Sequence, residues 1–221
     1  MICGKIETLQ RRDTKNMSEK PIIDQKSGLL NNARQVPSPN FDERPKKEDI
    51  TLIVIHNISL PPDEFGGHWI DKLFTNQLPK DKHPFFAKIY KLRVSSHLLI
   101  RRDGEIVQYV PFHKRAWHAG SSQFQGRAVC NDFSIGIELE GTDTQAFTDI
   151  QYRQLETTIK QLWQHYPNLP QGNITGHQHI APQRKTDPGP YFDWERLSDN
   201  LNENLPADAN SSRPITVNPK Y

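Results

Sequence analysis

The chain has 221 residues, of which 34% are hydrophobic, and it carries 28 Lys and Arg against 26 Asp and Glu. This length suits one domain with tails, since domains usually contain roughly 100 to 200 residues. The net charge of +2 is too balanced to indicate nucleic acid as a partner, and the absence of any run of ~18 apolar residues predicts no membrane partner.

Polar residues are concentrated at the two ends of the chain. Residues 1–25 and 206–221 have few large apolar side chains, so we expect an N-terminal extension and a C-terminal tail, both flexible, around one domain spanning 26–205. Cys3 and Cys130 provide no disulfide framework, and the N-terminus lacks the apolar run of ~7 to 15 residues that a secretory signal needs. We therefore expect a cytoplasmic protein and, without an obvious apolar stripe, a monomer.

The first elements precede a buried strand. Residues 27–34 suggest a short helix, and residues 36–45, stiffened by prolines, an extended strap along the domain edge. Residues 51–56 are a continuous apolar, β-branched run, which predicts a strand buried on both faces that ends at His56. Residues 58–67 hold two prolines and two glycines and are expected to form a loop over whatever His56 faces.

A short helix is expected over residues 69–74, followed by a hairpin. Residues 96–102 and 105–110 are β-prone and flank Asp-Gly, which supplies the positive φ angles of a tight turn. Residues 132–141 alternate apolar side chains with small or charged ones, which predicts another strand. Its two faces carry Phe133, Ile135, Ile137 and Leu139 on one side and Ser134, Gly136, Glu138 and Glu140 on the other.

The C-terminal part predicts two amphipathic helices. Thr148 and Gln151 form a capping box, so the first helix should begin at Asp149, and Pro167 should end it. The apolar faces of the two helices comprise Tyr152, Leu155, Ile159, Leu162, Trp163 and Tyr166, and then Trp194, Leu197, Leu201 and Leu205. Together the elements predict an α/β fold, a single domain with a central mixed β-sheet flanked by α-helices.

Residues 175–190 suggest half of a metal site. His177 and Asp187 are ligands of the kind that catalytic zinc uses, and the prolines nearby favour a turn that brings them together. His179 competes with His177, because the two would point in opposite directions in an extended segment. A third ligand is needed, and His56 is the candidate, although a histidine hydrogen-bonded in the core explains it about equally well.

Two further side chains have the chemistry that hydrolysis at zinc requires. Glu138 could accept a proton from water, and Lys185 could stabilise a developing oxyanion, although each taken alone is more simply a solvated residue. Clusters of aromatic and charged residues provide the remaining candidates, which surface ion pairs and core packing explain equally well: Arg93, His97, Trp117 and His118.

Five ordered motifs carry a family resemblance. They are residues 56–62, 93–104, 115–120, 130–141 and 175–190, and the similarity extends roughly over the whole predicted domain. They resemble the zinc amidases of type 2, a superfamily shared with the peptidoglycan recognition proteins, and in particular the cytoplasmic 1,6-anhydro-N-acetylmuramyl-L-alanine amidases. The resemblance implies a mixed sheet flanked by helices, Zn²⁺ as cofactor and an anhydromuropeptide as substrate.

The resemblance also implies a role for individual residues. The implied zinc ligands are His56, His177 and Asp187, so that His177 is preferred to His179. The implied water-activating acid is Glu138, and the implied cation at the tetrahedral intermediate is Lys185. The implied contacts with the muropeptide are Asn57, Arg93 and Trp117, of which Arg93 suits a peptide carboxylate.

The implied reaction is zinc-dependent hydrolysis of the amide between the lactyl group of (1,6-anhydro-)N-acetylmuramic acid and L-alanine of the stem peptide, in cytoplasmic peptidoglycan recycling. A non-hydrolytic muropeptide-binding module is the first alternative, and a zinc-stabilised structural domain with a fourth protein ligand is the second. The intact ligand and acid positions favour the enzyme. One departure is Val129, where relatives often have an arginine; with Arg127 two positions earlier, a contact with a substrate carboxylate is expected to be weakened or relocated.

Overall fold

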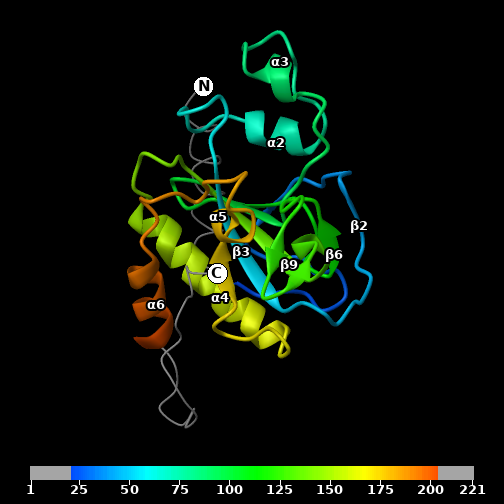
Figure 1. Ribbon diagram of the computed structural model, residues 1–221, viewed down its shortest axis with the longest axis vertical. Helices are drawn as coiled ribbons and strands as arrows, with labels where there is room; N and C mark the ends of the chain where they lie inside the picture. Colours follow the sequence, from blue (N-terminus) through cyan, green and yellow to red (C-terminus); the bar gives the residue numbers. More distant parts are fainter. Residues whose placement is uncertain (1–20, 204–221) are drawn as a thin grey trace, which may run out of the picture.

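A six-stranded mixed sheet forms the centre of the molecule (Figure 1). The computed structural model describes residues 21–203, so the expectations for residues 1–20 and 204–221, Cys3 and Leu205 included, lie outside the described part. The strand order is β1-β5-β4-β9-β3-β10. Only the β4–β5 pair is antiparallel, and the other neighbours run parallel, so the predicted mixed α/β fold is confirmed.

The strands of this sheet are β1 (Arg34–Gln35), β3 (Leu52–Ile58), β4 (Leu98–Ile100), β5 (Ile106–Gln108), β9 (Ser134–Glu140) and β10 (Ile174–Gly176). Two small antiparallel ladders join β2 (Phe41–Glu43) to β6 (Lys114–Ala116) and β7 (Gln123–Phe124) to β8 (Arg127–Ala128). The helical segments are α2 (Trp69–Phe74), α3 (Phe86–Ile89), η1 (Cys130–Asp132), α4 (Asp149–His165), α5 (His177–Ile180) and α6 (Trp194–Glu203).

One face of the sheet packs against α4 and α6, which lie side by side in Figure 1. Alternate residues of β3 and β9 point to this face, because successive side chains of a strand alternate. Ile53 and Ile55 from β3 and Ile135 and Ile137 from β9 share one buried cluster with the apolar face of α4. This packing fixes which residues of the same two strands must face the other way.

The opposite face is also largely buried, so β3 is covered on both faces as the sequence predicts. Strand β9, for which the sequence predicts only alternation, is buried on both faces as well. Val54 lies in a small cluster with Phe133, and Leu99 of β4 lies in another with residues of α2 and α3. The segment carrying α2 and α3 connects β3 to β4 and stands at the top of Figure 1. On this face His56, Ser134, Glu138 and Glu140 are the buried polar residues of β3 and β9.

The predicted hairpin and both predicted C-terminal helices are confirmed. Strands β4 and β5 pair as expected, but only Gly104 of the turn has a positive φ, and its N–H donates to the Arg101 carbonyl. Helix α4 begins at Asp149, and the Thr148 and Gln151 capping box is complete. The helix ends at His165, before Pro167.

Two local predictions are wrong. Residues 27–34 are not helical: Asp24 Oδ1 accepts from the N–H groups of Lys26 and Ser27, and Gly28 has a φ of 65°, so the segment turns instead. Strand β3 does not end at His56 but continues to Ile58. The sequence left the conformation around His177 and His179 open, and residues 177–180 form the single turn α5.

Packed structure begins earlier than the predicted domain boundary. Ile23 is buried and forms an isolated antiparallel bridge with Leu30, three residues before position 26. The strap over residues 36–45 is extended, as predicted, and its Val36 and Ser38 N–H groups donate to carbonyls at the β5 end. Between residues 21 and 203, no helix is both long and apolar enough to cross a membrane.

The side chain of Gln151 should contribute strongly to stability, because it joins α4 to two strands. Its Nε2 donates to the carbonyls of Ile100 and Glu140, both in a buried setting. Gln151→Leu should lower the free energy of unfolding by roughly 2–4 kcal/mol, since two buried acceptors lose their donor. Urea denaturation measures the change; Gln164→Leu, on the exposed side of the same helix, is the matched control. Equal effects of the two substitutions would contradict this role.

Candidate metal centre and cavity

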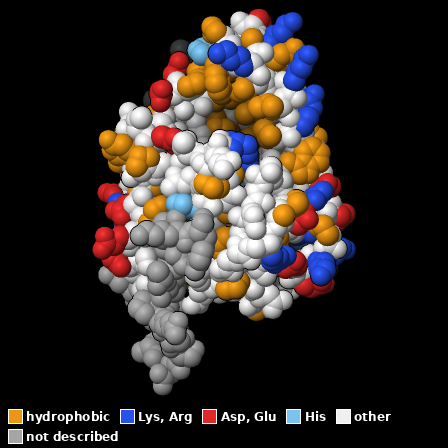
Figure 2. All heavy atoms as spheres, in the orientation of Figure 1, with side chains coloured by type: hydrophobic (Ala, Val, Ile, Leu, Met, Phe, Trp, Pro, Cys, Tyr) orange, Lys and Arg blue, Asp and Glu red, His pale blue; other side chains and the backbone are white. Residues whose placement is uncertain are grey.

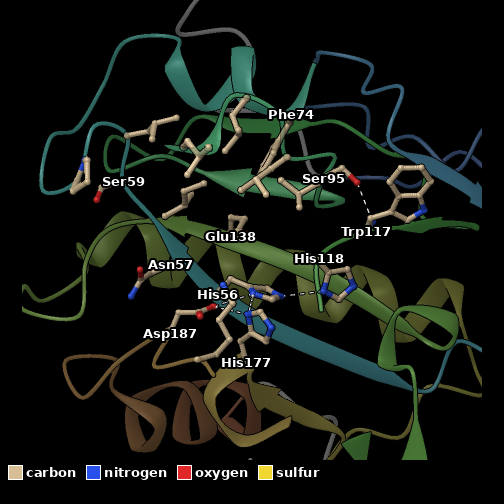
Figure 3. Close-up of a pocket in the computed structure, with 18 of the residues that line it drawn as sticks. His56, Asn57, Ser59, Phe74, Ser95, Trp117, His118, Glu138, His177 and Asp187 are labelled. Carbon is tan, nitrogen blue, oxygen red and sulfur yellow. Dashed lines mark hydrogen bonds and ion pairs between the residues drawn. The ribbon is translucent and has the colours of Figure 1, made fainter. Parts of the chain in front are cut away.

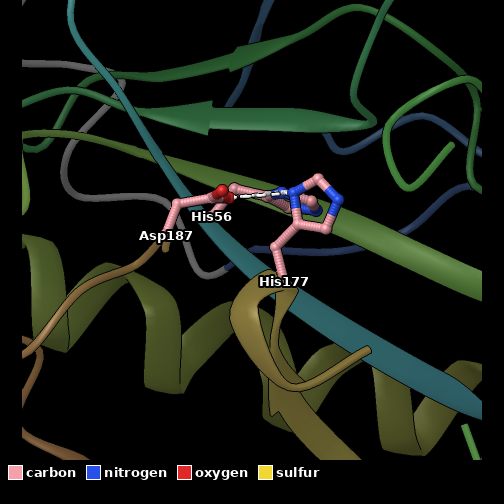
Figure 4. A group of neighbouring side chains, drawn as sticks. All are labelled: His56, His177 and Asp187. Atoms are coloured by element: carbon pink, nitrogen blue, oxygen red, sulfur yellow. Dashed lines mark hydrogen bonds and ion pairs between the residues drawn. The ribbon is translucent and has the colours of Figure 1, made fainter. Parts of the chain in front are cut away.

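Three predicted metal ligands meet at one point beside the sheet (Figure 4). His56 projects from β3; β10 pairs in parallel with β3 and is followed directly by His177, the first residue of α5. Asp187 comes from the loop after α5. Nδ1 of His56, Nδ1 of His177 and Oδ2 of Asp187 lie 3.0 Å from one another in all three pairs.

The chemistry of these three atoms fits a divalent metal ion. Nε2 of His177 lies 3.1 Å from the Ala119 carbonyl, which can only accept, so Nε2 carries the proton and Nδ1 presents a lone pair. Two imidazole nitrogens and a carboxylate oxygen form the donor set of a catalytic zinc site with an open position. The residues that would hold zinc are therefore His56, His177 and Asp187, as the resemblance implied.

Burial and mutual contacts control protonation within the triad. Burial, followed by the neighbouring His177 ring, lowers the pKa of His56 to about 4, so this imidazole is neutral near pH 7. Burial alone would favour neutral Asp187, but the His177 and His56 rings, each with Nδ1 3.0 Å from Oδ2, outweigh it and hold the pKa of the carboxyl well below its ordinary value. The triad thus combines a neutral His56 imidazole with an ionised carboxylate, the forms that bind metals.

Glu138 is the partner of His56 in the parallel register of β3 and β9, and it faces the same side. Its side chain is buried, and no hydrogen bond joins its carboxyl group to any residue between 21 and 203. Burial, and then the charge of Asp187, raise the pKa of Glu138 well above its ordinary value, while Lys185 opposes the shift. Such a carboxyl group is suited to exchanging protons with a reacting group.

Glu138, Lys185 and the metal triad line one cavity of about 420 Å³ (Figure 3). The cavity has two unlike walls. Polar residues of the sheet and the 181–190 loop form one wall, and the connection between β3 and β4 forms the other with apolar side chains. That apolar wall consists of Leu60, Leu73, Phe74, Phe85, Ile89, Leu92 and Val94. In Figure 2 hydrophobic side chains gather around a hollow in the same upper part of the molecule.

The three predicted substrate residues occupy different positions. Trp117 lines the cavity (Figure 3). Asn57 also lines it, but its Nδ2 donates to Asp143 Oδ1 at 2.7 Å and to the Pro188 carbonyl at 3.0 Å, so this amide holds the loop that carries Asp187. Arg93 is exposed and outside the cavity lining; its Nη1 donates to backbone carbonyls at positions 91 and 92.

The structure also places the histidines whose roles were open. His179 points away from the triad, with Nδ1 accepting from the Gly176 N–H and its ring 6.0 Å from that of Trp194. His97 is a buried core histidine whose Nδ1 accepts from the Gly136 N–H. His118 instead contacts the triad, since its Nδ1 lies 3.0 Å from His56 Nε2. Burial, then the charges of neighbouring histidines, lower the pKa of His118 well below its ordinary value.

Sequence reasoning missed the residues that support the ligands. Those outside the predicted set are Asn131, Ser134, Asp143 and Arg184. Their contacts span 7 to 86 positions along the chain, so spacing carried no signal for them. The one available signal was His118, which stood out beside Trp117 in a cluster of aromatic and charged residues but had no assigned role.

The position at which this chain has a valine and relatives often have an arginine lies away from the cavity. Val129 is 47% exposed and adopts a left-handed conformation with a φ of 58° just before η1. Arg127 pairs with Asp49 at 2.7 Å and covers the ring of Phe133. Neither residue lines the cavity that holds the triad. The side chain of Arg127 therefore joins β8 to Asp49 and Phe133 and not to the cavity.

Comparison with known proteins gives a consistent result. Residues 46–190 match the family described as N-acetylmuramoyl-L-alanine amidase. The chain is 66% identical over 170 residues to the 1,6-anhydro-N-acetylmuramyl-L-alanine amidase AmpD of Escherichia coli K12, covering 77% of this chain and 92% of that protein. A crystal structure of a selenomethionine derivative of AmpD is 62% identical with a TM-score of 0.77, covering 80% and 97% of the two chains.

A more distantly related structure contains a bound muropeptide. The structure of AmpDh3 from Pseudomonas aeruginosa with an anhydromuramic pentapeptide is 26% identical, with a TM-score of 0.52, and the match covers 70% of this chain and 61% of that one.

Acid should destabilise the protein partly through its buried neutral histidines. Burial, then Arg44, lower the pKa of His97 to about 3, whereas an unfolded histidine has an ordinary value of 6.5. Between these two pKa values only the unfolded chain binds the proton. The contribution of this histidine to the free energy of unfolding should therefore fall by about 1.4 kcal/mol for each unit by which the pH is lowered. Above the upper value the contribution is fully present.

Urea denaturation at a series of pH values between neutral and mildly acidic measures this slope. His97→Gln removes the titrating group and should give a shallower slope, whatever its effect on stability at neutral pH. His68→Gln is the matched control, because His68 is exposed. A His97→Gln slope equal to that of the wild type would show that His97 is not neutral in the folded state.

Proposed function

Because the chain belongs to the N-acetylmuramoyl-L-alanine amidase family, we propose that it hydrolyses the amide between the lactyl group of 1,6-anhydro-N-acetylmuramic acid and L-alanine of the stem peptide. The observation that carries the proposal is the triad of His56, His177 and Asp187 in one cavity with Glu138. The high identity to AmpD supports the anhydro sugar, and the muropeptide complex of a related amidase supports the substrate class.

The cofactor we propose is Zn²⁺, held by His56, His177 and Asp187. Their donor atoms are those that zinc prefers, and three protein ligands leave a position open for the reaction. When bound, zinc would act as a Lewis acid that polarises the scissile carbonyl and lowers the pKa of water. The alternative of a structural site with a fourth protein ligand finds no support, since among residues 21–203 only these three form the cluster.

Glu138 is proposed as the proton carrier. It would take a proton from the water that adds to the amide carbonyl carbon, and then deliver that proton to the departing nitrogen of L-alanine as the C–N bond breaks. Its raised pKa suits both steps, since the carboxyl must accept and release a proton in one cycle. Lys185, on the wall beside Asp187, would stabilise the negative charge on the former carbonyl oxygen.

Asn57, Arg93 and Trp117 remain the proposed substrate contacts, and the geometry supports them unequally. Trp117 lines the cavity and offers an aromatic surface to the muropeptide. Asn57 lies next to His56, although its amide hydrogens are already donated to Asp143 and Pro188. Arg93 lies between two cavity-lining residues, and its side chain would have to leave the carbonyls at positions 91 and 92 to bind a peptide carboxylate.

The cellular setting is also a proposal. Cytoplasmic peptidoglycan recycling would supply anhydromuropeptides as substrates, and the similarity to AmpD supports this role. We propose that the protein acts there as a monomer, without nucleic acid or a membrane as partner. Comparing turnover of anhydromuropeptides with turnover of intact murein separates recycling from remodelling of the wall, because only recycling requires preference for the released anhydro form.

Metal content should depend on His177 but not on His179. The purified wild type should contain about one zinc per chain, and His177→Ala should lose most of it, because His177 contributes a nitrogen to the triad and His179 does not. His179→Ala is the matched control and should retain zinc. Elemental analysis gives the stoichiometry, and mass spectrometry of products shows whether chelation abolishes release of stem peptide. Release of stem peptide that survives complete metal removal would overturn zinc dependence.

Replacing the proposed base should remove turnover while leaving the metal in place. Glu138→Gln keeps the size of the side chain but cannot accept the proton, so kcat should fall by about 10²–10⁴-fold. Zinc content and muropeptide affinity, measured by elemental analysis and calorimetry, should stay near wild-type values. A non-hydrolytic binding module would instead show no turnover in the wild type and no change in the variant.

A further inference from the structure

Two adjacent residues contact both histidines of the triad on the side away from the metal. His118 Nδ1 lies 3.0 Å from Nε2 of His56, and the Ala119 carbonyl oxygen lies 3.1 Å from Nε2 of His177. Both triad histidines therefore direct Nε2 to one short segment and Nδ1 to the metal position (Figure 3). The proton on each ring decides whether Nδ1 is a lone pair or a donor.

The hydrogen bonds run from His56 through His118 and Ser134 to the Cys130 carbonyl, and this carbonyl fixes the direction of all of them. Ser134 Oγ lies 2.6 Å from the Cys130 carbonyl and must donate its single hydrogen there, because a carbonyl only accepts. Ser134 Oγ then accepts from Nε2–H of His118 at 3.2 Å. The Nδ1 atom of His118 is consequently an acceptor, and it takes the proton on Nε2 of His56. The Nδ1 of His56 is left as a lone pair.

The segment that carries these two contacts is anchored independently of the triad. Oδ1 of Asn131 accepts from the N–H groups of both His118 and Ala119, at 3.1 and 2.8 Å. Nη2 of Arg184 donates to the Ala119 carbonyl at 2.6 Å. The His118 ring also lies against Gly136 of β9, where the methyl group of an alanine would come within 2.5 Å of the ring. The position of the ring is thus set by its surroundings, not by a metal.

We propose that His118 is a positioning residue that fixes His56 in the tautomer with the proton on Nε2, so that the metal-facing nitrogen is free before any metal arrives. The Ala119 carbonyl does the same for His177. The consequence for metal binding rests on the proposed zinc site, but the tautomer of His56 does not. Without His118, Nδ1 of His56 can carry the proton and donate it to Asp187 Oδ2, 3.0 Å away, which would block the ligand position.

Nitrogen NMR of metal-free protein labelled on histidine tests the tautomer directly. In the wild type, His56 should show a protonated Nε2 and an unprotonated Nδ1 near neutral pH. His118→Leu removes the acceptor and should give a mixture of tautomers or the Nδ1–H form at His56, with His177 unchanged. His118→Asn places a side-chain oxygen near the former Nδ1 and should restore the wild-type pattern. His179→Leu is the matched control and should leave both triad rings unaffected.

Zinc affinity provides the second readout. His118→Leu should weaken zinc binding by about 10–100-fold, as loss of a hydrogen-bond partner to a ligating histidine typically does, and His118→Asn should recover part of the loss. Should His118→Leu fail to fold, Ser134→Ala tests the same relay by removing the acceptor of the His118 Nε2–H, and a mixed tautomer at His118 is then expected.

The outcomes separate this inference from the zinc proposal. An Nδ1–H tautomer of His56 in the metal-free wild type, or an unchanged His56 tautomer in His118→Leu, would overturn the role of His118 whatever metal the site binds. A wild-type tautomer as inferred, together with no zinc binding, would overturn the zinc proposal and leave the positioning role of His118 standing.

Discussion

The parallel register between β3 and β9 is the constraint on which the site depends. It pairs His56 with Glu138, so the proposed metal ligand and the proposed proton carrier lie side by side on one face. A slip of one residue would turn Glu138 towards α4 and bury a carboxyl group in an apolar core. On the other side of β3, the pairing of Gly176 with Ile55 places His177 beside His56. Strand pairing thus brings together Glu138, His56 and His177, and only Asp187 depends on a loop.

The polar face of the sheet also shows why one glutamate is available for chemistry and its neighbour is not. Glu140 is two residues from Glu138 on the same strand and face, yet it accepts from Arg101 and from the N–H groups of Gly66 and Arg102. These bonds compensate its burial. Glu138 has no such partners among residues 21–203 and faces the cavity instead. The same side-chain type is structural at one position and chemical at the other because of its neighbours.

Features set by local sequence were predictable. The capping box of Thr148, the hairpin around Gly104 and the alternation along β9 depend on residues a few positions apart, and the structure has all three. The exception is Phe133, which was expected on the face of Ile135 but precedes β9 and clusters with Val54 on the opposite face. The helix expected over residues 27–34 does not form, because Asp24 makes turn-forming contacts and Gly28 has a positive φ. Here a weak helical preference competed with specific side-chain hydrogen bonds, and the bonds prevailed.

The residues of the site show the same difference between features set by local sequence and features set by packing. Spacing suggested His177 and Asp187 as a pair, but only the family resemblance chose between His177 and His179, because the choice depends on the turn of α5 that spacing did not reveal. The contact of His118 with His56 joins residues 62 positions apart, and nothing local marks it. Such contacts follow from the packing of β9, η1 and the 117–119 segment, which exists only once the sheet has formed.

The apolar wall of the cavity comes from a single connection, between β3 and β4, whereas the triad and Glu138 come from other parts of the chain. Shape and chemistry are therefore encoded in separate segments. The side chains of α2, α3 and their flanks can be exchanged in size, widening or narrowing the space opposite the metal, while the distances among the ligands stay the same. A change in this connection would therefore alter the shape of the cavity without rebuilding the triad or moving Glu138.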